Sequence, residues 1–526
     1  MKKNYFLFLL ISYLILGCNN LHSQSFVLNV ENFRHYIDVF NKDDNEIYGG
    51  YFSNNEAWKF LSMNIPIFNC PDKELEKTYY FRWWTFRKHI KQTPEGFVIT
   101  EFLPDVPWAG KYNTISCPAG HHFYEGRWLH NSIYLQDYAN FWFKGGGEPR
   151  RYSFWAANSI LTFAEVHQKK ELVVELLPFF DKNYKAWEKD KLCEDGLFWQ
   201  MDDRDGMELS IGGSGKRTTI NSYMFGEAEA IFLIANLAGN NALMEEYEVK
   251  AAMLKSLILS KLWDEQNDFF KTLPIDSEKL VNVRELHGYT PWYFSIPGKK
   301  HSSAWNYILQ TDGFQAPFGP TSAEQDHPDF MISYEGHECQ WNGPSWPFAT
   351  SVTLKAMANL LRNYNQRVIS KYDFMQLLLT YSMSHRRTMN NGSEICWIDE
   401  NLNPYTGDWI SRSRLKNWHD NGWSHEKGGV ERGKDYNHSA FCDFIISDLV
   451  GIRSSMGKKL EINPLIPSNY WNWFCLDNVN YHGKIIAIIW DREGTKYQKG
   501  KGFFVFLNGE IKHHSDSIRK VEINLY

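Results

Sequence analysis

Amphipathic segments with a helical period recur between residues 72 and 450 of this 526-residue chain. Between residues 222 and 237, apolar side chains repeat at steps of three and four, the spacing of one helix face. Loops rich in Gly, Pro, Asn and Trp separate the segments and hold every polar cluster discussed below. Long paired helices with functional loops at one end favour an α/α barrel over a doubly wound sheet. The segments are residues 72–89, 152–167, 172–187, 222–237, 242–262, 346–361, 372–384 and 436–450.

The pattern changes near Gly451. From Leu460 onward, short apolar runs of strand length follow one another, such as residues 484–490 and 502–507. Asn508-Gly509 directly after such a run is a hairpin signal. The chain is therefore predicted to be mainly α, with the barrel in residues 71–455 and a small C-terminal β-sandwich of structural role in residues 456–526.

The N-terminus is typical of an export signal. Lys2 and Lys3 precede an apolar run that ends at Gly17 and is too short to cross a bilayer comfortably. We interpret residues 1–17 as a signal peptide and residues 18–70 as a tether and N-terminal extended segment. Leu14-Ile-Leu-Gly-Cys18 resembles a bacterial lipoprotein cleavage site, which implies that Cys18 is lipidated. An ordinary signal peptide with an incidental cysteine is the alternative.

The lipoprotein interpretation predicts an exported protein that faces the periplasm or the cell surface and is anchored to the outer or inner membrane. Net charge is -6 with both signs mixed along the chain, and no basic stripe occurs, so nucleic acid is not expected as a partner. No Walker loop and no strand followed by a dinucleotide fingerprint occurs, which disfavours nucleotides.

Aromatic residues are abundant, with 21 Trp, 28 Tyr and 36 Phe. A large helical core accounts for many of them. The others cluster with Gly, Asn, His and carboxylates, as expected where flat rings stack on sugars and an indole N–H bonds a hydroxyl. The tryptophans therefore favour a carbohydrate ligand.

Two acidic clusters lie in such aromatic surroundings. The first, residues 199–208, begins at Trp199 and holds four carboxylates in seven residues, Asp203 and Glu208 among them. Mutual repulsion of close carboxylates raises at least one pKa, which suits a proton donor. The second cluster is Cys396-Trp-Ile-Asp-Glu400. Glycoside hydrolysis needs one protonated and one ionised carboxyl group. A solvated turn or a Ca²⁺ site is the alternative for the first cluster, although it lacks the ligand spacing of an EF-hand.

The first cluster resembles a known family. Asp205-Gly-Met-Glu-Leu-Ser210 is similar to the Glu-Ser-Gly-x-Asp-x-Ser motif of the α/α-barrel glycosidases of families 63 and 37, whose Asp is the general acid. Glu208 falls at that position, and Arg204 stands where the family has Glu. The resemblance implies that Glu208 is the general acid, with Asp205 as the alternative acid.

The second cluster continues the resemblance. Glu400-Asn-Leu-Asn-Pro-Tyr-Thr-Gly407 resembles the family segment Glu-x-Tyr-(Asn/Asp)-Pro-x-Thr-Gly, which carries the general base. This implies that Glu400 is the base, with Leu402 in place of the usual aromatic residue. Gly428-Gly-Val-Glu431 is similar to a Gly-rich segment near the trehalase active site, which implies that Glu431 binds a hydroxyl or positions water.

Two further segments are expected to contact substrate. Gln340-Trp-Asn-Gly-Pro-Ser-Trp346 resembles the Gln-Trp-Asp-x-Pro-x-Gly-Trp signature of trehalases. Gly120-His-His-Phe-Tyr-Glu-Gly-Arg-Trp128 resembles substrate loops of bacterial relatives that are similar to mannosylglycerate hydrolase. For the latter segment, a packed corner with an ion pair between Glu125 and Arg127 is the alternative. The expected substrate-binding residues are Trp199, Asp203, His121, Arg127, Trp128, Trp341, Asn342, Trp346 and Glu431.

Together these observations predict a six-hairpin (α/α)6 glycosidase that is exo-acting and, as the resemblance implies, inverting and most often specific for α-linkages. An inverting pair of carboxyl groups is about 6.5–9.5 Å apart. No organic cofactor is expected, and a structural Ca²⁺ is not indicated. A polysaccharide lyase that uses His121, Tyr124 and Arg127 is one alternative, and a non-catalytic glycan-binding lipoprotein is the other.

Overall fold

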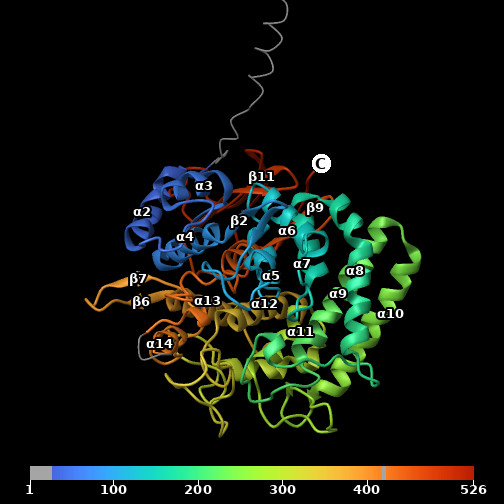
Figure 1. Ribbon diagram of the computed structural model, residues 1–526. Helices are drawn as coiled ribbons and strands as arrows, with labels where there is room; N and C mark the ends of the chain where they lie inside the picture. Colours follow the sequence, from blue (N-terminus) through green and yellow to red (C-terminus); the bar gives the residue numbers. More distant parts are fainter. Residues whose placement is uncertain (1–26, 418–421) are drawn as a thin grey trace, which may run out of the picture.

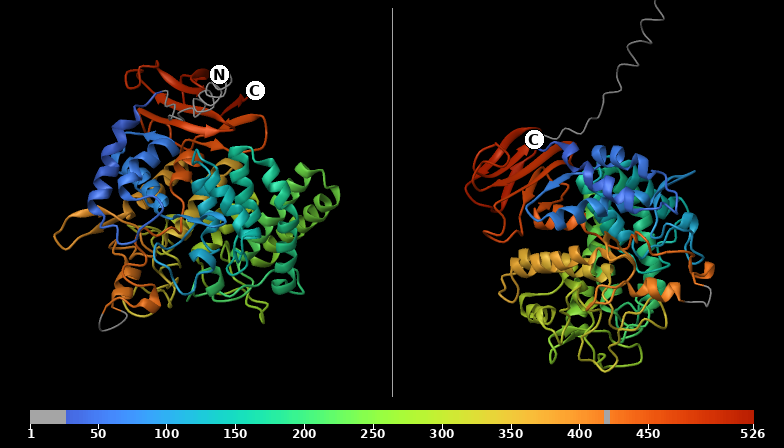
Figure 2. Two further views of the ribbon diagram at one scale, coloured as in Figure 1. Left: turned by 45° about the horizontal axis from the view of Figure 1, so that its top comes forward. Right: turned by 90° about the vertical axis from the view of Figure 1, so that its left-hand side faces the viewer.

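The computed structural model describes residues 27–417 and 422–526. Helices form the body of the molecule, and a β unit covers one end of it (Figures 1 and 2). The mainly α barrel with C-terminal strands is confirmed. The longer helices are α4 (Lys73–Lys88), α6 (Ile133–Lys144), α7 (Ala156–His167), α8 (Lys170–Lys191), α9 (Thr218–Ala238), α10 (Asn241–Leu257), α12 (Pro347–Asn363) and α13 (Lys371–Ser384).

Helix α9 lies at the centre of this packing, in contact with α7, α8, α10 and the short helix α11 (Thr290–Tyr293). Nearly every side chain from Thr218 to Ala228 is buried, so this half of the helix has no solvent face. Helix α12 is buried in the same way over its first fourteen residues, 347–360. Pro347 begins α12, at a position where its missing N–H is not needed.

One predicted helix is mostly wrong. Within residues 436–450, only a short π-helical turn, Phe444–Leu449, is long enough to be named, and residues 436–440 are not helical. The backbone N–H of Asn437 donates instead to the carbonyl of Glu101. The extended chain brings Tyr436 and His438 to the pocket described below, which a regular helix with its 3.6-residue period would not do for both.

The β unit is antiparallel. Its larger sheet has the order β1 (Ile67–Asn69), β10 (Trp473–Tyr481), β11 (Lys484–Asp491), β12 (Gly502–Leu507) and β13 (Glu510–Ser515). A second sheet has the order β14 (Val521–Asn524), β9 (Lys459–Ile462) and β8 (Ile452–Arg453). The predicted hairpin is confirmed, because Asn508 and Gly509 both have positive φ and join β12 to β13.

Residues 27–70 are not the extended segment that was predicted. They form helices α2 (Arg34–Asp43) and α3 (Ala57–Asn64), and strand β1 pairs with β10. Tyr36, Ile37 and Phe40 lie on one face of α2, and the ring of Phe40 packs against Phe81 and Trp84 of α4. The signal peptide and Cys18 lie outside the described residues. None of the helices in residues 27–417 and 422–526 is long and apolar enough to cross a membrane.

Candidate active site

A pocket of about 460 Å³ brings the two predicted catalytic residues together. Glu208 and Glu400 both line it, although they lie far apart in the sequence. Loops that follow strand β3 (Gly96–Ile99), the 3-10 turn Asp203–Asp205 and the segment before α12 form its walls. Aromatic rings from Phe102, Trp108, Tyr152 and Trp346 face the same space.

Glu208 stands on a loop with unusual backbone conformations. Gly206 has φ 70° and Leu209 has φ 60°, both in the left-handed region, and the carbonyl of Glu208 accepts the N–H of Trp341 at 3.1 Å. Left-handed conformations at non-Gly residues concentrate at functional sites. Burial raises the pKa of the Glu208 carboxyl to about 8, and the nearby carboxylates Asp203 and Glu400 add to this effect. Glu208 is therefore protonated at neutral pH and able to donate.

Glu400 has a cationic partner. The guanidinium of Arg432 holds its carboxylate with two bonds, Nε to Oε1 at 2.8 Å and Nη2 to Oε2 at 3.0 Å. Such a two-pronged, charge-assisted pair favours the ionised carboxylate. The thiol of Cys339 lies 3.5 Å from Oε2. Arg432 also reaches Glu338 at 3.4 Å, so Arg432 links two acidic residues of the pocket.

Glu101 also lines the pocket, and this was not predicted from the sequence. The hydroxyl of Tyr436 donates to its Oε1 at 2.6 Å, and Nε2 of His438 lies 3.3 Å from the same atom. Burial raises the pKa of Glu101 to about 8. Glu101 has no acidic or Trp neighbour in the sequence; its only signal is a lone carboxylate in the apolar run Phe97-Val-Ile-Thr-Glu-Phe-Leu103.

Asp205, the alternative acid, points away from the pocket. It is 2% exposed, and its Oδ2 forms an ion pair with Nε of Arg217 at 2.6 Å. The hydroxyls of Ser153 and Thr219 also donate to its carboxylate. A carboxylate held in this way supports the loop that carries Glu208, so the structure does not favour Asp205 as the proton donor.

Of the other residues predicted to contact substrate, some line the pocket and some do not. Asp203 and Trp346 line the pocket. Trp341 stacks behind Trp346 with ring centroids 4.3 Å apart, so it supports that wall. Neither Trp341 nor Asn342 is among the described lining residues.

Trp199 and Glu431 also lie elsewhere. The ring of Trp199 packs under Lys191, whose Nζ is 3.7 Å from the ring centroid. Glu431 is engaged by Arg412 and Arg387. The prediction that these two residues contact substrate in the pocket is not supported.

The prediction for His121, Arg127 and Trp128 is wrong, because all three are buried in the barrel interior. The ring of His121 packs edge-on against Trp155 and Phe348. The side chains of Arg127 and Trp128 both donate to Oδ1 of Asp443 at 2.7 Å.

The alternative ion pair between Glu125 and Arg127 is also wrong. Glu125 accepts the backbone N–H groups of residues 441–443 instead. Residues 120–128 thus form a packed corner, but the carboxylate that pairs with Arg127 is that of Asp443, far away in the sequence.

Asp443 is the centre of what we term the interior ion network. Lys355 binds Asp443 at 2.9 Å and Asp448 at 2.7 Å, and Arg362 binds Asp448 at 2.6 Å. All of these side chains are buried, and the neighbouring Arg127 and Lys355 hold the pKa of Asp443 well below its usual range despite burial. Among the described residues, no group of three or more His, Cys, Asp or Glu side chains is arranged to hold a metal ion.

Comparison with known proteins agrees with the fold. Residues 455–513 match the C-terminal domain of glycosyl hydrolase family 65. A solved structure named sialidase is 38% identical, with a TM-score of 0.88 over 96% of this chain and 46% of that chain. The GH63 mannosylglycerate hydrolase from Thermus thermophilus, solved with Tris, is 10% identical, with a TM-score of 0.50 over 70% of this chain and 100% of that one.

An uncharacterised protein of Borreliella burgdorferi is 23% identical over 257 residues, which are 45% of this chain and 51% of that protein. The chain thus spans about half the length of this curated relative and 46% of the sialidase chain. Residues 111–439, more than half of the chain, match the family described as mannosylglycerate hydrolase MGH1-like glycoside hydrolase domain. The chain therefore belongs to the MGH1-like glycoside hydrolases.

Proposed function

We propose that this protein is an exo-acting, inverting glycosidase, with Glu208 as general acid and Glu400 as general base. The observation that carries the proposal is that two carboxyl groups with contrasting partners line one pocket. Burial raises the pKa of Glu208, whereas the guanidinium of Arg432 binds both oxygens of Glu400. An inverting glycosidase needs one protonated and one ionised carboxyl group at the start of its reaction.

In this mechanism, Glu208 gives its proton to the glycosidic oxygen as the bond to the anomeric carbon breaks. Glu400 takes a proton from a water molecule that attacks the opposite face of the sugar. Arg432 orients the Glu400 carboxylate through its two bonds. A pocket of about 460 Å³ is at the small end of the range for ligand sites and fits a terminal sugar, which agrees with exo-action. The kinship with families 63 and 37 favours an α-linked substrate.

The charges of the pocket favour a neutral sugar. Each Arg or Lys among the described lining residues has an acidic partner: Arg432 with Glu400, Lys427 with Glu338 at 2.9 Å, and Arg204 with Asp203 at 3.4 Å. The carboxylate of an acidic sugar would have to displace one of these partners. We therefore infer a neutral terminal sugar, even though one similar structure carries the name sialidase.

The two roles can be separated by the leaving group of the substrate. Glu208→Gln should lower turnover of an unactivated glycoside at least about 100-fold, because proton donation contributes this much. On a 2,4-dinitrophenyl glycoside, whose leaving group needs no proton, the loss should be far smaller. Glu400→Gln should impair both substrates alike, since attack by water is needed in each case. Steady-state kinetics on a panel of aryl glycosides measures this.

Glu101 is the second candidate for the acid, because its pKa is raised to the same value. Its carboxyl already accepts the Tyr436 hydroxyl, and we assign it to substrate binding. Glu101→Gln should therefore impair activated and unactivated glycosides by the same factor. If Glu101→Gln rather than Glu208→Gln lost much more activity on the unactivated glycoside than on the activated one, the general acid would be Glu101. NMR of the first-formed anomer tests inversion, and retention would contradict it.

The rival lyase has little support. His121, Tyr124 and Arg127, which it would use, are absent from the described pocket lining, and Tyr124 donates to Asn158. A non-catalytic glycan-binding protein would tolerate Glu208→Gln with unchanged output. We further propose that the protein is exported and anchored to a membrane through a lipid on Cys18, which mass spectrometry of the mature N-terminus tests.

A further inference from the structure

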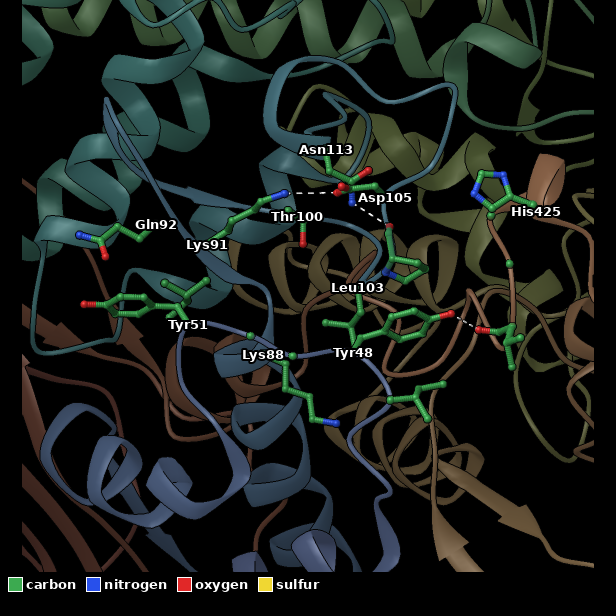
Figure 3. A pocket seen from close by; sticks show the side chains of 18 of the residues that line it. Tyr48, Tyr51, Lys88, Lys91, Gln92, Thr100, Leu103, Asp105, Asn113 and His425 are labelled. Carbon is green, nitrogen blue, oxygen red and sulfur yellow. Dashed lines mark hydrogen bonds and ion pairs between the residues drawn. The ribbon is translucent and has the colours of Figure 1, made fainter.

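Figure 3 shows the lining of a second and larger cavity, of about 1150 Å³. Two stretches of chain line both this cavity and the catalytic pocket. Glu101 and Phe102 line the catalytic pocket, whereas Thr100 and Leu103 line the second cavity. In the same way, residues 426 and 427 line the first and residues 425 and 428 line the second. Residues 100–103 and 425–428 therefore form a partition between the two spaces.

The charged groups of the second cavity are balanced. Lys91 pairs with Asp105 at 3.2 Å, and Figure 3 shows this pair across the cavity. Lys88 is buried and pairs with Asp44 and Asp435. Each Lys among the described lining residues therefore has a carboxylate partner. An anionic ligand would have to break one of these pairs, so the cavity favours a neutral ligand.

The remaining walls combine rings with polar groups. Tyr48 and Tyr51 come from the loop before α3, and Gln92, Thr100 and His425 surround them (Figure 3). Tyr51 is 45% exposed, and its ring is available on one side. Flat rings beside hydroxyl, amide and imidazole groups match the alternating C–H faces and hydroxyls of sugars better than they match an apolar ligand.

Glycines line the cavity from two sides: Gly49 and Gly50 on one segment, and Gly428 and Gly429 on the other. A Cβ added to Gly49 would meet no heavy atom within 4 Å, so this backbone faces open space. Uncovered peptide groups offer donors and acceptors to hydroxyls without a side chain between them.

We propose that the second cavity is a binding site for a neutral oligosaccharide. Its volume lies slightly above the usual upper value for small-molecule sites, which is enough for several sugar units. The proposal rests on the proposed function only for the class of ligand. The oligosaccharide in the cavity has one of two sources. It is either a distant part of the same substrate molecule whose terminal sugar is cleaved in the catalytic pocket, or a separate glycan. The shared partition places such a ligand next to the residues that carry Glu101 and Lys427.

The structure offers a blocking variant with a matched control. Gly49→Phe adds a ring at a position that lines the cavity and where a Cβ meets no neighbour, and Gly49→Ala adds only a methyl group there. The probe is an array of neutral oligosaccharides of one to six units, with the Glu208→Gln protein as parent so that nothing is cleaved. Gly49→Phe should weaken retention of the longer oligosaccharides at least tenfold, while Gly49→Ala retains them like the parent. Equal unfolding temperatures show that both variants fold.

Kinetics distinguish the two sources. If the substrate chain itself fills the cavity, Gly49→Phe raises KM for oligosaccharides and leaves aryl monoglycoside turnover unchanged. If a separate glycan fills it, both activities stay unchanged while array retention is lost. Retention by Gly49→Phe equal to that of the parent, or no retention by the parent, overturns the proposal. Failure of the catalytic assignment would appear separately, as full turnover in Glu208→Gln.

Discussion

The interior ion network and the catalytic pocket both hold buried ionisable side chains, and they differ in how the charges are paired. In the interior ion network, every carboxylate has a Lys or Arg partner, as Asp443 has Arg127 and Lys355. In the catalytic pocket, Glu208 and Glu101 have no Lys or Arg ion pair in the described part of the chain, and burial keeps them neutral. Full pairing stabilises a fold, whereas an unpaired carboxyl beside a cavity can exchange a proton with a ligand.

The largest expected effect is on stability, in the interior ion network. Asp443→Ala leaves Arg127 and Lys355 buried without their shared partner. Breaking a buried pair in this way costs about 3–5 kcal/mol of unfolding free energy. Denaturant titration measures the loss. In contrast, Glu208→Gln replaces a carboxyl that is neutral in the fold by an amide of similar shape. Below pH 4.5, where the unfolded chain carries a neutral carboxyl as well, its unfolding free energy should change far less than that of Asp443→Ala. Similar losses in both variants would remove the distinction between the clusters.

The next effect is on the pH dependence of activity. Glu208 must be protonated to donate, and its pKa is raised to about 8. The value of kcat/KM should therefore have an alkaline limb that falls as the pH rises through about 8. Glu227 of α9 has a pKa raised to the same value by burial but does not line the pocket. Glu227→Gln should leave the alkaline limb in place, and its disappearance in that variant would contradict the assignment to Glu208.

Glu227 should instead appear in the pH dependence of stability. Its pKa is higher in the folded protein than the ordinary value of 4.5, so the neutral carboxyl stabilises the fold fully below pH 4.5. This contribution is lost as the pH rises from 4.5 through about 8, with a slope of about 1.4 kcal/mol per pH unit for one proton. Glu227→Gln should reduce the slope of the unfolding free energy over this range by that amount. An unchanged slope would show that Glu227 is ionised when folded.

The smallest effect is expected at the surface. Lys459 and Glu522 pair at 3.4 Å between β9 and β14, with side chains 67% and 50% exposed. Exposed pairs contribute about 0–1 kcal/mol because solvent screens them. Lys459→Ala should therefore change the unfolding free energy by less than about 1 kcal/mol. A loss as large as that in Asp443→Ala would show that burial does not decide the worth of an ion pair here.

Features set by near neighbours in sequence could be predicted. The period of residues 222–237 predicts α9, and Asn508-Gly509 predicts the last hairpin, because both signals are local. The segment 436–450 carries a helical period, but tertiary contacts with Glu101 override it. Helix α2 was missed because its apolar face is short and lies in a polar sequence.

In the catalytic pocket, too, only features set by near neighbours in sequence could be predicted. Glu208 and Glu400 could be proposed because each lies in a local acidic and aromatic cluster. The partners that set their protonation could not, since Arg432 reaches Glu400 only in the folded chain. Arg127 looked like a substrate contact for the same reason: its partner Asp443 lies 316 residues away.

The first described residues have a consequence for how the enzyme meets its substrate. The N–H groups of Val27 and Leu28 bond to Oδ2 of Asp477 in β10 at 2.8 and 2.9 Å, so the chain enters the fold at the β unit. The segment between α11 and α12, which contributes Glu338 and Cys339 to the pocket, lies at the opposite end (Figure 1). A lipid attached ahead of Val27 would hold the β unit toward the bilayer. The loops between α11 and α12 would then face away from the bilayer, where polymers too large to approach the lipid surface could still present their ends.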